Sequence, residues 1–212
     1  MGIEPTLEGV SVAASGLYGL WLVRRPASVR RTLAKATAVA ALAVLAYVSG
    51  APIALTVALV LSALGDAFLA GESERWLPFG LTAFLAAHLG YIWLFVHDGG
   101  GRAVLLAEPM RALGVTMVFT AGVALLVWLW RGLGALRMAV ALYAIALCAM
   151  AAASFTLPSR LWPAMAGAAA FVVSDGILSA QLFKGLRAPW ATYAVWGLYY
   201  AAQALIVWAY LK

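Results

Sequence analysis

Long apolar stretches separated by short polar breaks dominate the hydrophobic pattern of this chain. A helix that crosses a membrane needs ~20 mostly apolar residues, and eight stretches of about this length follow one another along the sequence. The breaks hold Gly, Pro and basic residues, which end helices or mark the ends of spans. The pattern predicts an all-α, polytopic membrane bundle of eight transmembrane helices, at residues 7–23, 32–50, 53–71, 76–96, 111–130, 134–155, 161–184 and 190–211.

The composition strengthens this prediction. Of the 212 residues, 66% are hydrophobic and only 10% are charged, whereas a soluble domain is about half apolar and a quarter charged. The apolar stretches run through both halves without a polar linker, so we expect a single membrane domain over residues 1–212. The net charge of +6 is then explained by orientation signals and contacts to membrane lipids, and no nucleic-acid partner is predicted.

The distribution of basic residues predicts an orientation in the cell (inner) membrane. Glu4 and Glu8, not basic residues, precede the first stretch, so we expect a retained helix rather than a cleaved signal peptide. Ten of the 14 Lys and Arg residues fall in the odd-numbered connections or beside them. Because cytoplasmic loops carry an excess of Lys and Arg, both termini are expected outside. The longest connection, residues 97–110, is then an external loop.

Two acidic side chains inside the apolar stretches are the strongest chemical signal. An Asp near the centre of a membrane helix costs ~2.5–3.5 kcal/mol on insertion scales, and such residues usually face the bundle interior. Asp66 lies about 7–8 Å from the cytoplasmic end of its helix and Asp175 about 13 Å from the end of its own. These depths allow both to face one cavity, and His88 is a third catalytic candidate. The structural alternative for the two Asp residues is capping a broken helix or pairing with an Arg, and for His88 it is a hydrogen bond to a neighbouring carbonyl.

Other polar residues reach similar depths and would line such a cavity. Each could equally form an ordinary hydrogen bond between helices. Lys35, at the cytoplasmic start of the second stretch, could either reach toward the interface or hold a lipid phosphate. The predicted substrate-binding residues are Lys35, Ser62, Tyr91, Tyr143, Ser174, Tyr199, Tyr200 and Gln203.

Several site classes are excluded by the sequence. The single Cys148 cannot form an intramolecular disulfide or a multi-thiolate metal site. Only His88 and His97 are present, and His97 lies in the external connection, so a cage of several His ligands is excluded. HExxH and GxSxG motifs do not occur. No metal and no organic cofactor are predicted.

Three ordered segments resemble the YhhN family of membrane proteins. Residues 62–91 (SALGDAFLAGESERWLPFGLTAFLAAHLGY) resemble the family pattern S-x-x-G-D-x-F-L followed by G-L-x-A-F-L-x-A-H-x-x-Y. Residues 167–180 (GAAAFVVSDGILSA) resemble G-A-x-x-F-x-x-S-D-x-x-L-A, and residues 199–206 (YYAAQALI) resemble Y-Y-x-A-Q-x-L-I. The chain departs from the pattern at Ala36, where Pro often follows the Lys, and at Ser179, where Ala is usual; neither departure affects the Asp residues.

The resemblance implies an ether hydrolase, because the characterised YhhN members are lysoplasmalogenases. They cleave the vinyl ether bond of a lysophospholipid to a fatty aldehyde and a glycerophospho-ethanolamine or -choline. The residues suit this chemistry, since it needs one protonated acid and one group that activates water and stabilises a cation. Two carboxyl groups that share a proton could supply both the acid and the second group. The active site is expected toward the cytoplasmic leaflet. Which Asp is the acid, the headgroup preference and the oligomeric state stay open.

Three other readings compete with hydrolysis. Intramembrane Asp and His also serve proton-coupled transporters and lipid flippases, and residues 62–70 and 172–180, which each carry Asp followed by Leu three residues later, could mark a tandem repeat typical of transporters. Paired Asp residues also occur in intramembrane proteases, although the Tyr-Asp and Gly-x-Gly-Asp motifs of those enzymes do not occur here. A purely structural membrane module is the last alternative.

Overall fold

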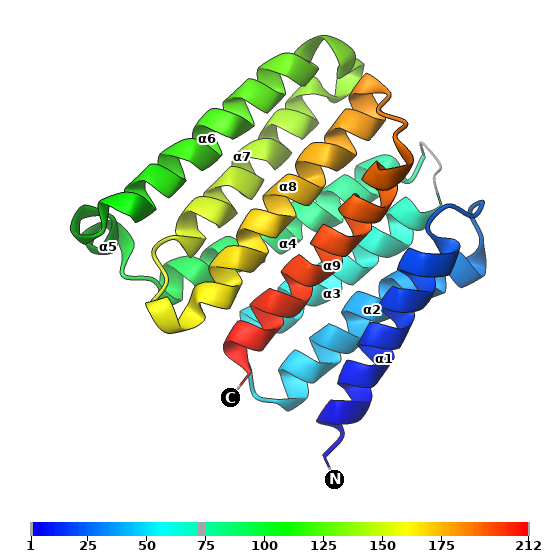
Figure 1. Ribbon diagram of the computed structural model, residues 1–212, viewed down its shortest axis with the longest axis horizontal. Coiled ribbons are helices and arrows are strands. Elements are labelled where there is room, and N and C mark those ends of the chain that lie inside the picture. The colour runs from blue at the N-terminus through cyan, green and yellow to red at the C-terminus, as the bar shows by residue number, and fades with distance from the viewer. Residues whose placement is uncertain (1, 72–74, 212) are drawn as a thin grey trace. The chain divides into compact units, whose positions relative to one another are not determined.

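The computed structural model describes residues 2–71 and 75–211, and every element within these ranges is helical (Figure 1). The all-α fold class is therefore confirmed. The chain divides into two compact units, one formed by residues 1–91 with 210–212 and the other by residues 92–209. Because α4 (Leu77–Asp98) is continuous across this division, each unit contains part of it.

The first unit contains the N-terminal helices: α1 (Glu4–Gly16), the π-helix η1 (Leu17–Leu22), α2 (Val29–Val48), α3 (Ile53–Ala70) and the first part of α4. Ser28 caps α2 by accepting a hydrogen bond from the Arg31 amide at 3.3 Å, as expected for a helix start. Gly50, with φ of +69°, ends α2 in the predicted break. Helix α2 packs between α1 and α3, because small residues such as the buried Ala38 allow close approach.

Helices α3 and α4 approach closely at three glycines in the first unit. A Cβ added at Gly65 would lie 2.6 Å from the Phe84 ring, one at Gly80 2.5 Å from Leu69, and one at Gly90 3.2 Å from Ala58. These contacts pair early positions on one helix with late positions on the other, so the two helices run antiparallel. The register places the middle of α3, with its polar residues, against the middle of this part of α4.

The second unit contains the end of α4, then α5 (Gly101–Ala107), α6 (Pro109–Leu129), α7 (Arg137–Ser154), α8 (Trp162–Lys184) and most of α9 (Pro189–Tyr210), with short 3-10 turns η2 (Trp130–Gly132), η3 (Gly134–Leu136) and η4 (Ser159–Leu161). Helix α7 packs against both α6 and α8. At Gly167 an added Cβ would lie 2.7 Å from the Ala202 carbonyl oxygen. Glycine at this position therefore lets α8 and α9 meet backbone to backbone.

Arg111 at the start of α6 ties three helix ends of the second unit together. Its guanidinium donates to the carbonyls of Phe155, at 3.1 Å, and Leu157, at 2.5 Å, and to the Ser159 hydroxyl at 2.9 Å, while its Nε lies 2.7 Å from Glu108. Orphan carbonyls at a helix end are usually satisfied by such donors. Arg111 thus has a structural function at this end of the second unit.

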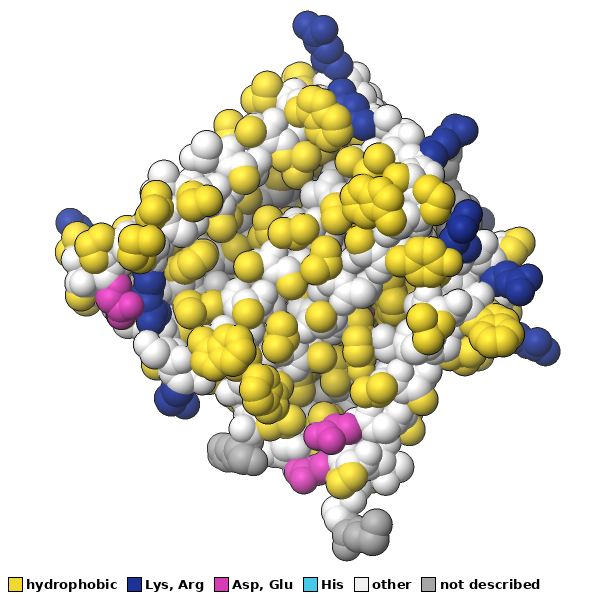
Figure 2. All heavy atoms as spheres, in the orientation of Figure 1, with side chains coloured by type: hydrophobic (Ala, Val, Ile, Leu, Met, Phe, Trp, Pro, Cys, Tyr) yellow, Lys and Arg dark blue, Asp and Glu magenta, His cyan; other side chains and the backbone are white. Residues whose placement is uncertain are grey.

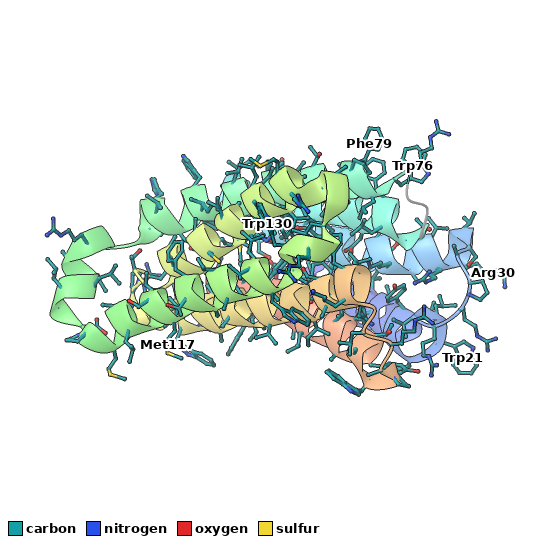
Figure 3. All side chains as sticks on the ribbon, turned by 90° about the horizontal axis from the view of Figure 1, so that it is seen from above. Trp21, Arg30, Trp76, Phe79, Met117 and Trp130 are labelled. Carbon is teal, nitrogen blue, oxygen red and sulfur yellow. The ribbon has the colours of Figure 1, made fainter. Side chains whose placement is uncertain are left out.

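Within the described residues, six helical segments are long and apolar enough to cross a membrane: residues 29–48, 53–70, 77–98, 109–132, 134–154 and 159–184. The chain is therefore an integral membrane protein. Large apolar side chains reach the surface (Figure 2), and Met117, which is 63% exposed, points away from α6 (Figure 3). Helices also occupy the first and last predicted ranges, but these do not meet the same criterion, so the count of eight spans stays a prediction.

Two local features differ from the predicted pattern. Residues 97–110 are not one continuous loop, because α4 extends to Asp98 and α5 occupies Gly101–Ala107. The Gly100 amide donates to the Thr156 carbonyl at 2.9 Å and so fixes this connection to the end of α7. The first predicted span changes from α-helix to π-helix at Leu17, and such wide turns often occur at functional sites.

Candidate functional site

Asp66 forms an ion pair with Lys35 inside the first unit. The Lys35 ammonium nitrogen lies 3.0 Å from Asp66 Oδ1, and the two side chains are 16% and 1% exposed. The helices bring them together because α2 and α3 are neighbours joined by a short turn. A buried charge is stable only when it is paired, so Lys35 makes a carboxylate tolerable at this depth. The sequence indicated both residues as candidates, but the two roles predicted for Lys35, reaching toward the interface or holding a lipid phosphate, did not include Asp66 as its partner.

Tyr18 and Arg31 are neighbours of this pair that sequence reasoning missed. The buried Tyr18 ring, in the π-helical turn, has its centroid 5.9 Å from Lys35 Nζ and 5.8 Å from Arg31 Cζ. Both distances are within the range of a cation–π interaction. Arg31 also donates to the Ala70 carbonyl at 3.3 Å and to the Val23 carbonyl at 3.4 Å. A sequence signal did exist, since Arg31 and Lys35 are four residues apart on one helix face.

Ser62 lies one turn before Asp66 on the same face of α3, and both side chains are buried. The Ser62 hydroxyl oxygen has no hydrogen-bond partner among the residues that the structure describes. Buried hydroxyl groups are normally satisfied by protein or by ordered water. Ser62, one helical turn from Asp66, is therefore able to bind a substrate oxygen or a water molecule.

His88 and Tyr91 lie fully buried on α4, within the first unit. His88 Nδ1 lies 2.6 Å from the Phe84 carbonyl oxygen. This contact fixes the ring and makes Nδ1 the protonated nitrogen, because Nδ1 donates when its partner is a carbonyl. Phe84 in turn packs on Gly65, next to Asp66. The catalytic role that the sequence predicts for His88 stays a prediction.

Asp175 is held by Tyr143 in the second unit. The Tyr143 hydroxyl on α7 donates to Asp175 Oδ2 on α8 at 2.5 Å, and Asp175 is 8% exposed. The two residues are 32 positions apart and meet because α7 packs against α8. In contrast to Asp66, which faces an ammonium group, Asp175 faces a neutral phenol. The two carboxyl groups therefore have different electrostatic surroundings.

The remaining predicted residues of the second unit lie where α8 faces α9. The Ser174 hydroxyl donates to the Val195 carbonyl at 2.9 Å, a structural contact between these helices. Tyr199 packs edge-on against Phe171, with ring centroids 5.3 Å apart. Gln203 is fully buried, whereas Tyr200 is half-buried and stacks on Trp196. The aromatic rings of Tyr199 and Tyr200 on α9 thus pack against other rings, whereas the Ser174 hydroxyl is occupied by a backbone carbonyl.

Each unit contributes one Asp with its own fixed partner, Lys35 for Asp66 and Tyr143 for Asp175. That the two carboxyl groups meet in one chamber stays a prediction. No group of three or more His, Cys, Asp or Glu side chains that could hold a metal ion occurs among the described residues. The candidate side chains offer carboxyl, phenol, ammonium and imidazole groups.

Comparison with known proteins gives the family of this chain. Neither a protein of curated function nor a solved structure is detectably similar to it. A sequence model of the YhhN family matches residues 30–210, which include α2 from its second residue, α3 to α9 and both Asp residues but not Tyr18. This match covers most of the chain and agrees with the three motifs around Asp66, Asp175 and Gln203. The chain therefore belongs to the YhhN family.

Proposed function

We propose that this membrane protein hydrolyses the vinyl ether bond of lysoplasmalogens, releasing a fatty aldehyde and a glycerophospho-ethanolamine or -choline. The observation that carries the proposal is the pair of differently partnered Asp residues, one at an ammonium group and one at a phenol, in a chain of the YhhN family. Vinyl ether hydrolysis needs one group that gives a proton and one that acts as an anion, and two unlike carboxyl groups can fill these two roles.

Asp175 is the proposed acid. In the first step its carboxylic proton is transferred to the alkene carbon distal to the ether oxygen, and the C=C π electrons form the new C–H bond. The carbon attached to oxygen becomes part of an oxocarbenium ion. Tyr143 donates to Oδ2 at 2.5 Å, so it orients the carboxyl group and stabilises the carboxylate that the transfer leaves behind.

Asp66 is the proposed base and anionic stabiliser. Its carboxylate, kept as an anion by the Lys35 ammonium, favours the oxocarbenium ion and accepts a proton from the attacking water. The resulting hemiacetal collapses to the aldehyde: the glycerol oxygen leaves with the proton that Asp66 took from water, and the hemiacetal hydroxyl gives its proton to the Asp175 carboxylate. One water molecule is consumed and both carboxyl groups return to their starting states. We propose that Ser62 or His88 orients this water.

A lysophospholipid fits this arrangement because its phosphate stays at headgroup level and its ether linkage lies just beneath. Lys35 is assigned to Asp66, so we propose that exposed basic residues of the connection between η1 and α2 hold the phosphate. Arg30 at the start of α2 extends outward (Figure 3). The alkenyl chain would then follow apolar and aromatic side chains such as Tyr91 and Tyr199. No cofactor takes part in this scheme.

The test is purified protein incubated with 1-alkenyl lysophosphatidylethanolamine or -choline, with aldehyde measured by mass spectrometry. We expect stoichiometric release of aldehyde and the glycerophosphodiester, and no release from the saturated 1-alkyl analogue, because only the vinyl ether can be protonated at carbon. The same protein in liposomes serves as a transport assay. Lipid flux without aldehyde formation would refute hydrolysis and favour the transporter or flippase alternative.

We also propose eight crossings, with both termini outside and the catalytic residues toward the cytoplasmic leaflet. The continuous helix of residues 4–22 is close to the ~20 residues that a crossing needs, and α9 has 22 residues. A membrane-impermeant thiol label should react in intact cells with a Gly2→Cys variant. It should react with Ala27→Cys, on the exposed connection before α2, only after the membrane is opened. The reverse pattern would contradict this orientation.

A further inference from the structure

Four exposed cations surround one end of the second unit, where α6 and α8 end and α7 begins. This basic rim consists of Arg131, Arg137, Lys184 and Arg187. The segments that form it, residues 125–140 and 181–192, contain no Asp or Glu. Dark-blue side chains project at this end of the unit, without magenta ones among them on the face shown (Figure 2). The positive charge of the rim is therefore not balanced by carboxylates of its own segments.

A small apolar core holds the basic rim in place. Leu129, Leu133 and Val140 are buried there, and Phe183 of α8 packs against them. At Gly132 an added Cβ would lie 2.6 Å from the Phe183 carbonyl oxygen, so the turn after α6 sits directly on the end of α8. Both 3-10 turns and the start of α7 are thus attached to the unit, and the rim is a fixed surface.

Two exposed tryptophans alternate with the buried Leu129 and stand beside the cations. Trp128 is 52% and Trp130 is 41% exposed. Lys184 Nζ lies 5.1 Å from the Trp128 ring centroid, and Arg137 Cζ lies 5.8 Å from that of Trp130. Indole rings concentrate at the level of lipid headgroups, and a cation over an indole face is held in position. Cations beside exposed indole rings are the arrangement expected at the level of lipid phosphates.

Helix ends alone do not account for this surface. Basic residues are favourable near helix C-termini, and Arg137 Nε does donate to the Trp130 carbonyl at 3.3 Å. Arg137 nevertheless lies at the start of α7, where a cation is unfavourable for the helix dipole. Its exposed guanidinium can still form paired hydrogen bonds with a phosphate.

We propose that the basic rim binds the phosphate of an anionic phospholipid, such as phosphatidylglycerol, with Trp128 and Trp130 at the level of the glycerol backbone. This lipid is a structural partner of the second unit and is distinct from the zwitterionic lysolipid proposed as substrate. The inference rests on charge, aromatic placement and rigidity, so it does not depend on the enzymatic proposal. Polybasic membrane-proximal surfaces attract anionic lipids in the same way.

Native mass spectrometry of the full-length protein in mixed micelles of phosphatidylglycerol and phosphatidylcholine tests this inference. We expect wild-type protein to retain phosphatidylglycerol preferentially. The Arg137→Gln, Lys184→Gln double variant should retain it roughly 25-fold less, since each cation near a membrane surface changes binding roughly fivefold. The matched control is Arg102→Gln, Arg160→Gln, which removes two exposed cations elsewhere in the same unit and should behave like wild type.

Three results of the retention measurement would overturn the inference. They are equal retention of the two lipids by wild-type protein, unchanged retention in the rim variant, and equal loss in the control variant. Displacement of the lipid by an equal concentration of inorganic phosphate would also overturn it, because the rim would then be a site for free phosphate. A melting temperature measured in phosphatidylcholine micelles confirms that the variants are folded.

Discussion

Replacing Asp175 with Asn is expected to lower the turnover number for aldehyde release by about 10²- to 10⁴-fold, which is the range for loss of a general acid. The amide keeps the shape of the side chain and can still accept the Tyr143 hydrogen bond, but it has no proton of suitable acidity to give to the alkene carbon. Turnover number and KM should be measured separately with the 1-alkenyl lysolipid, and we expect the loss in the turnover number.

Two companion variants make this prediction specific. Asp98→Asn carries the same chemical change at the end of α4, where Asp98 contacts the exposed His97, and it should leave turnover unchanged. Tyr143→Phe removes the donor but keeps Asp175, so it should lower turnover less than Asp175→Asn does. Full activity in a folded Asp175→Asn enzyme would remove this residue from the mechanism. Equal loss in Asp98→Asn would indicate a general defect.

Replacing Lys35 with Met is expected to destabilise the protein by about 3–5 kcal/mol, the range for breaking a buried ion pair from one side. Asp66 is 1% exposed, and without the ammonium group its carboxylate would lose this ion pair while it remains buried. The free energy of unfolding in mixed micelles, obtained from denaturant titration followed by circular dichroism, is the measurement. The partial exposure of Lys35, at 16%, places the expected value toward the lower end.

A double variant separates stability from catalysis. Lys35→Met combined with Asp66→Leu replaces the whole pair with apolar groups, which is often neutral for stability, so we expect the free energy of unfolding to recover while aldehyde release stays lost. Arg30→Met, an exposed position on the same helix, is the control and should change stability by less than about 0.5 kcal/mol. A Lys35→Met protein as stable as wild type would show that the pair does not contribute to folding.

Membrane helices are predictable from sequence because the bilayer imposes a local requirement. Each helix satisfies its backbone hydrogen bonds within itself and must be apolar over a fixed length. The predicted ranges therefore coincide closely with helices in the structure, including the ends at Gly50 and Gly185, whose positive φ values suit glycine. The same requirement makes Asp66 and Asp175 conspicuous, since a charge in this layer is retained only where it has a function or a partner.

The partners of the candidate site depended on tertiary structure. Whether Lys35 meets a lipid phosphate or Asp66 is decided by the rotation of α2 about its axis against α3, which hydropathy does not encode. In the sequence Tyr143 is one of several polar candidates, and only the packing of α7 against α8 places its hydroxyl on Asp175. Nothing in the sequence indicated Tyr18 as a site residue, because its position beside Lys35 results from the π-helical turn of η1.

The sequence by itself determined the class of protein, the positions of its helices and the two carboxyl groups that an apolar environment makes expensive. Tertiary structure alone decided that one carboxyl group faces an ammonium and the other a phenol. The physical reason is range: helix formation and membrane insertion depend on neighbouring residues, whereas side-chain pairing depends on how separate helices pack. The different chemistry proposed for Asp66 and Asp175 follows from that packing.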